Sequence, residues 1–470
     1  MARYKRGRTW LGGIGFLAVL ASAALGLLGS GNPAADRVVR ASEAALLRPN
    51  GSPQMTSMQA LPPEQDELMC PWLPASAETT LMAALQAPLT ASNVGADSSA
   101  LKPVRTIRDP YAAYSSVAVD PTNNEVVLTD ENLFQILVYD RLANTPPTAK
   151  MTEPKRIIGG LNTKIEFQCG LYIDPTSGDI YAVNNDTVDT LVIFSRQAKG
   201  DVPPSRELHT PHGTFGIGVD EQAQEMYLTI QHDAAVVVYH KMAQDQEGPI
   251  RRLQGDSTRL ADPHGLALDT KNQLMFVTNH GGRHEVKPGG RKAVTYAEGG
   301  TDDKPNWPIG EEVPGSGRHF PPAITVYPLK ATGDVAPLRV IEGPKTQMNW
   351  PTGLAVDVER GELYVANDMG DSILVFDVNA SGDVAPKRVI RGPKTNLSNP
   401  TGVWLDQKNG EVWAANFGNH SATVYKMNAS GDTPPLRMIR SGPMEEPALG
   451  IGNPHPIAFD TKREEILVPN

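Results

Sequence analysis

The residues of this chain best suited to chemistry are its histidines, because a neutral imidazole binds Zn, Cu, Ni or Fe and titrates near physiological pH. The sequence holds ten of them, and several recur at two places in a repeated pattern of short apolar segments. His264 and His455 directly precede the first segment of a repeat, whereas His280 and His420 follow the second. If successive segments are antiparallel strands, these positions share one end of the strands, which we call the upper face. We take His264, His280 and His455, with His420 and Asn279 beside them, as candidate ligand or metal residues.

A structural interpretation competes with the metal site. Asn ends the second segment of most repeats, at Asn184, Asn279, Asn367, Asn416 and Asn470. An Asn side chain bonds to nearby backbone and tolerates a left-handed conformation, so the recurrence favours a turn-capping role for Asn279. On this interpretation the histidines are polar loop residues and no cofactor is required. On the metal interpretation a divalent ion, Zn or Ca, lies in a central channel.

The elements that must position these residues form a repeat of roughly 50 residues. Its clearest copies begin with Pro351–Asp357 (PTGLAVD) and Pro400–Asp406 (PTGVWLD). In the first copy a second strand is predicted at 362–367 and a third at 373–377, and a Gly-Asp-Val-Ala-Pro turn leads to a fourth at 387–391. Four short strands rich in Val, Ile, Leu and Tyr, separated by turn residues, predict one blade of an all-β protein, a β-propeller.

The Asp that ends each first strand counts the blades. It falls at Asp120, Asp174, Asp220, Asp269, Asp357, Asp406 and Asp460. The intervals are 46 to 54 residues, except for 88 residues between Asp269 and Asp357, where we expect an insertion at 281–322. The last copy supplies only two strands, so we expect Val104–Arg108 and Ile457–Asn470 to share one blade and close the ring. The sequence thus predicts seven blades, with six as the rival if the last two strands dock elsewhere.

The remaining chain precedes the propeller, which we place at 103–470. Residues 1–35 begin with Arg3, Lys5, Arg6 and Arg8 and continue with an uncharged apolar run at 11–28, which predicts a signal-anchor or a long signal peptide. Either one places the rest of the chain outside the cytoplasm, in the periplasm, at the cell surface or secreted, and the anchor would attach it to a membrane. Residues 36–102 are rich in Ala, Ser and Pro and are interpreted as a stalk or linker.

The composition limits the classes of partner and activity that the sequence supports. The formal net charge is −10, and Lys and Arg form no stripe, which argues against a nucleic-acid partner. The two cysteines, Cys70 and Cys169, either pair in an oxidising compartment or remain independent thiols. The sequence has no Gly-rich phosphate loop, no Gly-x-Ser-x-Gly and no His-Glu-x-x-His, and this favours a non-enzymatic protein.

The sequence of the repeat resembles that of known β-propeller repeats. Pro-x-Gly-Leu-Ala-Val-Asp followed by Leu-Tyr-Val-Ala-Asn resembles NHL-type and YVTN-type β-propeller repeats, and the unit from Ile324 to Ile341 is similar to secreted bacterial NHL-repeat proteins of unassigned function. Related families include lactone hydrolases and zinc-dependent lyases, and others only bind partners. The resemblance therefore implies the fold and leaves two functions open: a scaffold that binds a protein or small-molecule ligand through the upper face and the insertion, or a metal-dependent lyase or lactone hydrolase in the channel.

Overall fold

The computed structural model describes residues 111–185, 188–283 and 317–443, and two short strands, β27 (Ala458–Asp460) and β28 (Glu465–Leu467). Several predictions fall outside these residues: the leader at 1–35, the stalk at 36–102, the strand at Val104–Arg108, His455, Cys70, and residues 284–316 of the insertion. Within the described part of the chain, no helix is long and apolar enough to cross a membrane.

The described residues form six four-stranded antiparallel sheets, which we number as blades 1 to 6. Blades 1 to 3 consist of β1 (Tyr114–Asp120), β2 (Glu125–Asp130), β3 (Gln135–Asp140), β4 (Arg156–Gly159); β5 (Gln168–Ile173), β6 (Ile180–Asn184), β7 (Thr190–Phe194), β8 (Arg206–His209); and β9 (Thr214–Asp220), β10 (Glu225–Ile230), β11 (Ala235–His240), β12 (Arg251–Gln254).

Blades 4 to 6 follow the same order of strands. They consist of β13 (Pro263–Asp269), β14 (Leu274–Asn279), β17 (Ala323–Pro328), β18 (Arg339–Glu342); β19 (Pro351–Asp357), β20 (Glu362–Asn367), β21 (Ser372–Asp377), β22 (Arg388–Arg391); and β23 (Pro400–Asp406), β24 (Glu411–Asn416), β25 (Ser421–Lys426), β26 (Arg437–Arg440). The insertion lies in blade 4 between β14 and β17, and its two ends pair as β15 (Gly282–Arg283) and β16 (His319–Phe320).

Short 3-10 helices complete the blades. Four follow fourth strands: η3 (Leu161–Thr163), η4 (Asp256–Thr258), η5 (Pro344–Thr346) and η7 (Pro393–Thr395). Two follow second strands: η6 (Asp368–Gly370) and η8 (Phe417–Asn419).

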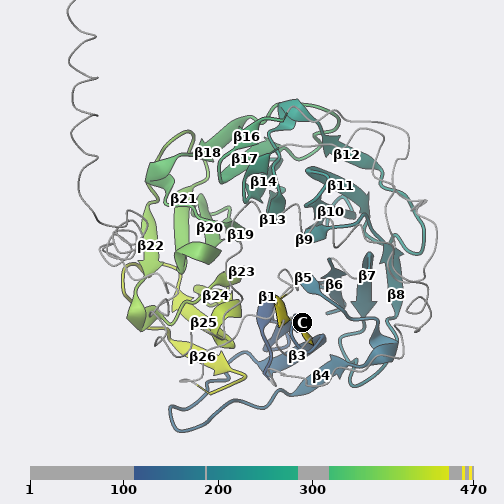
Figure 1. Cartoon of the computed structure of the whole chain (residues 1–470), viewed down its shortest axis with the longest axis vertical. Helices are drawn as coiled ribbons and strands as arrows, with labels where there is room; N and C mark the ends of the chain where they lie inside the picture. Colours follow the sequence, from purple (N-terminus) through teal and green to yellow (C-terminus); the bar gives the residue numbers. More distant parts are fainter. Residues whose placement is uncertain (1–110, 186–187, 284–316, 444–457, 461–464, 468–470) are drawn as a thin grey trace, which may run out of the picture. The chain divides into compact units, whose positions relative to one another are not determined.

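The six blades stand in a ring with their first strands innermost (Figure 1). Each first strand contacts the first strands of both neighbouring blades, and β23 of blade 6 contacts β1 of blade 1. The all-β β-propeller is therefore confirmed, but the prediction of seven blades is wrong. Blade 6 has its own fourth strand and packs directly on blade 1. Among the described strands, β27 and β28 pair only with each other.

The core lies between the blades. Each hydrophobic cluster takes side chains from two neighbouring sheets, and the cluster that closes the ring joins Tyr114 and Leu128 of blade 1 to Trp413 and Val424 of blade 6. The second strand of each blade lies in the middle of its sheet with both faces covered, as in β20, where every residue is buried. This explains the continuous apolar runs in the sequence, because a strand buried on both faces does not alternate between apolar and polar residues.

The Asp used to count blades is a turn residue. Asp120 accepts backbone N–H groups from Thr122 and Asn123 at 3.0 and 2.9 Å, and the equivalent Asp in each of the other blades accepts at least one such bond. An Asp side chain that bonds two or three residues ahead fixes the tight turn between first and second strands.

The Gly-Asp turn before the fourth strand joins neighbouring blades. Asp383 of blade 5 accepts the backbone N–H of Lys345, in blade 4, at 2.7 Å. The same 2.7 Å bond is made by Asp201, Asp334 and Asp432, each to the preceding blade. The repeated Asp thus holds the outer edges of four blade pairs together.

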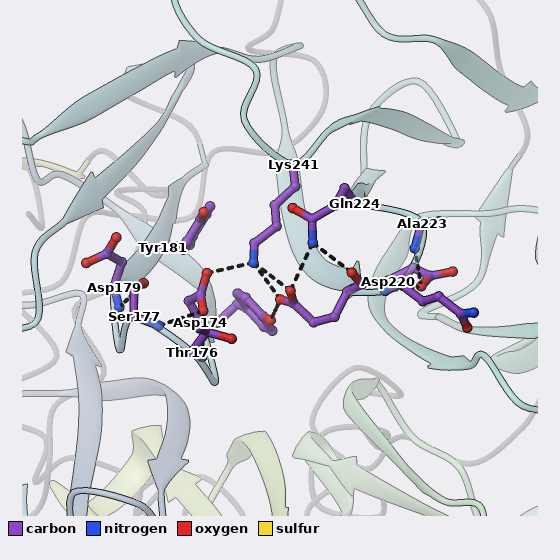
Figure 2. Close-up of polar contacts among 12 residues, drawn as sticks. Asp174, Thr176, Ser177, Asp179, Tyr181, Asp220, Ala223, Gln224 and Lys241 are labelled. Atoms are coloured by element: carbon purple, nitrogen blue, oxygen red, sulfur yellow. Dashed lines mark hydrogen bonds and ion pairs between the residues drawn. The ribbon is translucent and has the colours of Figure 1, made fainter.

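Charged residues at the lower ends of the strands supplement these bonds (Figure 2). Lys241 follows β11, is almost completely buried, and reaches Asp174 of blade 2 at 2.6 Å. It also contacts Glu221 at 2.7 Å, and that carboxylate accepts a hydrogen bond from the Tyr172 hydroxyl. Arg141 occupies the equivalent position in blade 1 and reaches Glu411 of blade 6 at 3.0 Å. Both cations therefore bind one blade to the one before it.

Candidate ligand site at the mouth of the central channel

A central cavity of about 260 Å³ is lined by the first strands of all six blades. Its wall includes the glycine at the same repeat position in each of blades 2 to 6, namely Gly170, Gly216, Gly265, Gly353 and Gly402, and blade 3 adds Gly218. A Cβ on Gly353 would lie 2.7 Å from the carbonyl oxygen of Thr401 in the next blade, and a Cβ on Gly265 would overlap the carbonyl oxygen of Thr352. The Gly of the repeated Pro-x-Gly motif is therefore required by the close approach of neighbouring blades.

One backbone hydrogen bond recurs at the mouth of the cavity in every blade. The residue after the second strand donates its N–H to the carbonyl of a residue in the loop that leads into the first strand. The six pairs are Glu131–Ala113, Asn185–Phe167, Gln231–Gly213, His280–Asp262, Asp368–Trp350 and Phe417–Asn399, at 2.7 to 3.1 Å. This shared frame places the same two loops side by side in each blade, so the chemistry of the mouth depends only on which side chains occupy it.

Blade 4 fills this frame with an acid and two imidazoles. Asp262 has a left-handed backbone (φ 54°), as do its equivalents Trp350 and Asn399, and it precedes His264 by two residues. The Asp262 carboxylate lies 3.7 Å from His264 Nδ1 and 3.7 Å from His280 Nδ1. Ligand atoms of the three residues all lie within 4.8 Å of one another. Both histidines are buried, whereas the Asp262 side chain remains 38% exposed. The group thus opens to solvent on the acid side.

Aromatic rings extend the group across three blades. The rings of His264 and His280 stack with centroids 3.3 Å apart. Phe215 of blade 3, which lines the cavity, packs against His264 at 4.2 Å, and Trp350 of blade 5 stacks on His280 at 4.8 Å. The four rings form a row that begins at the cavity wall and ends at Trp350, which is 51% exposed. One face of the site is therefore a flat, partly exposed ring.

Neighbouring backbone and side chains hold the two histidines in place. The carbonyl of His264 accepts a hydrogen bond from the Thr229 hydroxyl of blade 3. The amide oxygen of Asn279 accepts the N–H of Ala261 at 3.0 Å and so fixes the loop that carries Asp262. Thr352 of blade 5 places its hydroxyl 3.1 Å from His280 Nε2. Asn279 is thus a positioning residue, in line with the structural interpretation of the recurrent Asn.

The burial of the group changes its proton affinities. Partial burial raises the pKa of Asp262 to about 6, although a hydrogen bond with the Gln231 side chain and the nearby His232 act in the opposite direction. Burial lowers the pKa of His280 well below its usual value, and His264 beside it adds to this effect. At neutral pH the site therefore presents a carboxylate and a neutral imidazole at His280, which are the states that bind metals.

The structure brings together only some of the predicted site residues. The rings of His264 and His280 lie together, with centroids 3.3 Å apart. His455 lies outside the described residues. His420 lies two blades away, where its Nδ1 is 2.8 Å from the Ala112 carbonyl oxygen of blade 1. Cys169 is buried in the cavity wall 3.5 Å from Glu131, and because Cys70 is not described, their pairing stays a prediction.

Sequence reasoning missed Asp262, Trp350 and Phe215. Alignment of the repeats carries the signal for the first two. Asp262-Pro263-His264 stands where blade 5 has Trp350-Pro351-Thr352 and blade 6 has Asn399-Pro400-Thr401. An acid and a histidine that replace neutral residues in one copy of a repeat indicate a local function.

Comparison with known proteins agrees with this fold. The family described as SMP-30/Gluconolactonase/LRE-like region matches residues 326–433, which lie in blades 4 to 6 and do not include Asp262, His264 or His280. The blade sequence, the six-bladed ring and this match together support an NHL-type β-propeller. No curated protein matches the chain in sequence.

Two solved structures illustrate the likeness. Hydrazine synthase of Kuenenia stuttgartiensis aligns with a TM-score of 0.43 and 12% identity, over 69% of this chain and 99% of that one. A nidogen/laminin complex aligns with a TM-score of 0.42 and 13% identity, over 72% of this chain and 97% of that one. Likenesses at this level say nothing about function.

Proposed function

We propose that the protein is a non-enzymatic, extracytoplasmic binding propeller that takes its ligand at the upper mouth of the channel, over blades 3 to 5. The observation that carries this proposal is the row of rings from Phe215 to Trp350. Aromatic rings favour offset or edge contacts with other rings, and a half-exposed ring at the end of a row provides a surface for one more. We expect a ligand with a flat unsaturated group.

The surroundings of Trp350 support an amphipathic ligand. Met369 follows the second strand of the same blade and is 49% exposed, so two large apolar side chains are exposed on one blade at the mouth. The Asp262 carboxylate, which is 38% exposed, provides a polar partner beside the ring row. Pockets of this kind bind by apolar contact and use a few polar groups to orient the ligand.

The location of the protein is part of the proposal. The basic and apolar leader at 1–35 supports export, with attachment to a membrane through residues 11–28 if the leader is retained. The insertion at 281–322 starts directly after His280 and returns at β17, so its ends emerge beside the site. We propose that the insertion contributes to the choice of ligand.

A second candidate function is a metal-dependent lyase or lactone hydrolase in the same place. The Asp262–His264–His280 group favours it, because a metal with an open position can polarise a carbonyl or activate water. The gluconolactonase-related match adds little to it, since residues 326–433 leave out the whole group.

Ligand-observed NMR with a set of small aromatic acids and amides tests the binding proposal. Saturation transfer should detect binders to the wild-type chain, and Trp350→Ala should remove most of the signal. Leu436→Ala is the matched control, because Leu436 is 45% exposed but lies before β26 and away from the mouth. Equal saturation-transfer signals with the wild type, Trp350→Ala and Leu436→Ala would contradict the proposed place of binding. Conversion of any of these compounds to a product would favour the enzyme.

A further inference from the structure

We infer that Asp262, His264 and His280 bind one divalent transition-metal ion of zinc-like preference, with one coordination position left open toward the mouth of the channel. This inference deepens the proposed function, because the ion would lie beside the ring row that receives the ligand. It rests on the geometry of the three side chains and on the partners that orient them.

The distances suit a metal better than they suit hydrogen bonds. The Asp262 carboxylate is 3.7 Å from Nδ1 of each histidine, which is too long for a hydrogen bond. A tetrahedral zinc ion with bonds of about 2.0–2.1 Å separates its ligand atoms by roughly 3.3–3.4 Å. The three side chains approach this spacing, and to enclose one ion the His264 Nδ1 bond to the Asp262 carbonyl oxygen would break and the two stacked rings would tilt apart.

The neighbouring blade orients one imidazole for this role. His280 Nε2 lies 3.1 Å from the Thr352 hydroxyl, and when that nitrogen donates, the lone pair of Nδ1 faces Asp262. Metal-binding histidines commonly use their second nitrogen in this way, and such partners fix both tautomer and ring orientation. Thr352 is therefore a positioning residue that blade 5 supplies to a site on blade 4.

His264 lies on β13, whereas His280 follows β14, and the His264 imidazole approaches the same Asp262 carboxylate. Its Nδ1 lies 3.0 Å from the backbone carbonyl oxygen of Asp262. For the ion to bind this nitrogen, the neutral ring would change tautomer: Nδ1 would give its proton to solvent, Nε2 would take one up, and the hydrogen bond to the carbonyl would be replaced by a metal bond. Imidazole binds a metal in its neutral form, through the ring nitrogen that carries no proton.

The donor set selects the class of ion. Ca²⁺ takes six to eight oxygen ligands, whereas two imidazoles and one carboxylate suit Zn²⁺ and its neighbours Co²⁺ and Ni²⁺. Three protein ligands leave a fourth position open, which is typical of sites that act on or hold a ligand and not of structural sites. The exposed side of Asp262 places this position at the mouth.

The other blades provide an internal comparison. The equivalents of Asp262, His264 and His280 are Trp350, Thr352 and Asp368 in blade 5, and Asn399, Thr401 and Phe417 in blade 6. In the parts of the chain that the structure describes, this is the one group of three or more His, Cys, Asp or Glu residues with the spacing of a metal site. Blade 4 thus differs from its neighbours in chemistry while keeping their backbone.

Cobalt titration of the tag-free, full-length, chelator-stripped protein tests the inference. We expect one equivalent of Co²⁺ to bind with visible absorption bands of four-coordinate intensity and to be displaced by Zn²⁺. Asp262→Asn keeps the shape and tolerates the left-handed backbone, and it should weaken binding by about tenfold or more. His264→Ala with His280→Ala should remove it. His240→Ala is the matched control, because His240 is exposed at the end of β11 and should leave the titration unchanged.

Two results would overturn the inference. One is a wild-type chain that shows no absorption band and no saturable Zn²⁺ binding up to about 100 µM. The other is Co²⁺ binding that Asp262→Asn and the double variant leave intact. Trp350→Ala separates this test from that of the proposed function: it should keep Co²⁺ binding and lose the aromatic ligand. Ligand capture that persists in a chelator would leave the binding function standing without the metal.

Discussion

Blade 4 and blade 6 have the same backbone arrangement at the mouth of the channel but carry different side chains there. In both, the residue after the second strand donates its N–H to the incoming loop at 3.0 Å, and in both the accepting residue is left-handed. Blade 6 fills the three side-chain positions with Asn399, Thr401 and Phe417. Blade 4 fills them with Asp262, His264 and His280.

The difference separates what the repeat must keep from what it can vary. Glycines at the cavity wall, Asp at the first turn and Asp in the Gly-Asp turn are tied to backbone partners in the same or neighbouring blade. Side chains at the mouth differ between blades, and although some of them also bond to backbone, as His264 does to the Asp262 carbonyl, the recurring frame bond itself joins backbone to backbone. Function in a repeat protein is thus expected where one copy departs from the others at positions that the fold does not use.

Substitution of a glycine at the cavity wall should lower the stability of the fold the most. Gly265→Ala would place a Cβ against the Thr352 carbonyl oxygen, and backbone cannot move aside as a flexible side chain can. We expect the free energy of unfolding to fall by about 3 kcal/mol. Denaturant unfolding measures it, with Ser116→Ala as control, since blade 1 already carries a side chain at this position. A change below about 1 kcal/mol would show that the blades are not packed as closely as the structure indicates.

Loss of an ion pair within a blade should have the next largest effect. Glu362, at the start of β20, receives two bonds from Arg388 at 2.7 and 2.8 Å. Blades 1, 3 and 6 repeat this pair, whereas blade 4 has Leu274 at the Glu position. Glu362→Gln should lower the free energy of unfolding by about 2 kcal/mol at pH 7.

The pH dependence checks the cause. The bonds from Arg388, assisted by Lys387 and Tyr364 and opposed by burial, lower the pKa of Glu362 to about 2. A carboxyl with a lowered pKa stabilises the fold above its ordinary pKa and loses this contribution as the pH falls from about 4.5 to 2. The difference between wild type and Glu362→Gln should be constant from pH 5 to 7 and shrink below about pH 4.5. A difference independent of pH would point to packing instead.

The bond between blade edges should contribute less. Asp383→Ala removes the side chain that accepts the Lys345 N–H, and we expect a loss of about 1 kcal/mol, as for a helix N-cap. Asp383→Asn should recover most of it because its amide oxygen can accept the same bond. Thermal unfolding of the three proteins measures the order. If Asn behaves like Ala, the charge of Asp383 is what matters and not its hydrogen bond.

The fold was largely predictable because the repeat is local. The strands predicted at Pro351–Asp357 and Pro400–Asp406 coincide with β19 and β23. The number of blades was not predictable, because closure of the ring depends on contacts between residues far apart in the sequence. One such contact is the hydrogen bond of 2.8 Å from the Thr401 hydroxyl of blade 6 to the Ser115 carbonyl oxygen of blade 1. Asp460 has the same sequence position as the other six Asp residues, yet its strand β27 pairs only with β28 among the described strands.

The site was predictable in part for the same reason. His264 and His280 could be placed on one face from strand direction alone. Their convergence with Asp262 and Trp350 depends on the left-handed turn at Asp262 and on the angle between blades 4 and 5, which no local pattern specifies.

A graft between the two blades tests the central claim most directly. In the variant Asp262→Asn, His264→Thr, His280→Phe, blade 4 carries the mouth residues of blade 6. We predict an unfolding free energy within about 1 kcal/mol of wild type, because the frame bonds are backbone bonds, together with complete loss of Co²⁺ binding. Unfolding of the graft variant, or metal binding that survives it, would contradict the division of the blades into a shared frame and a separate site.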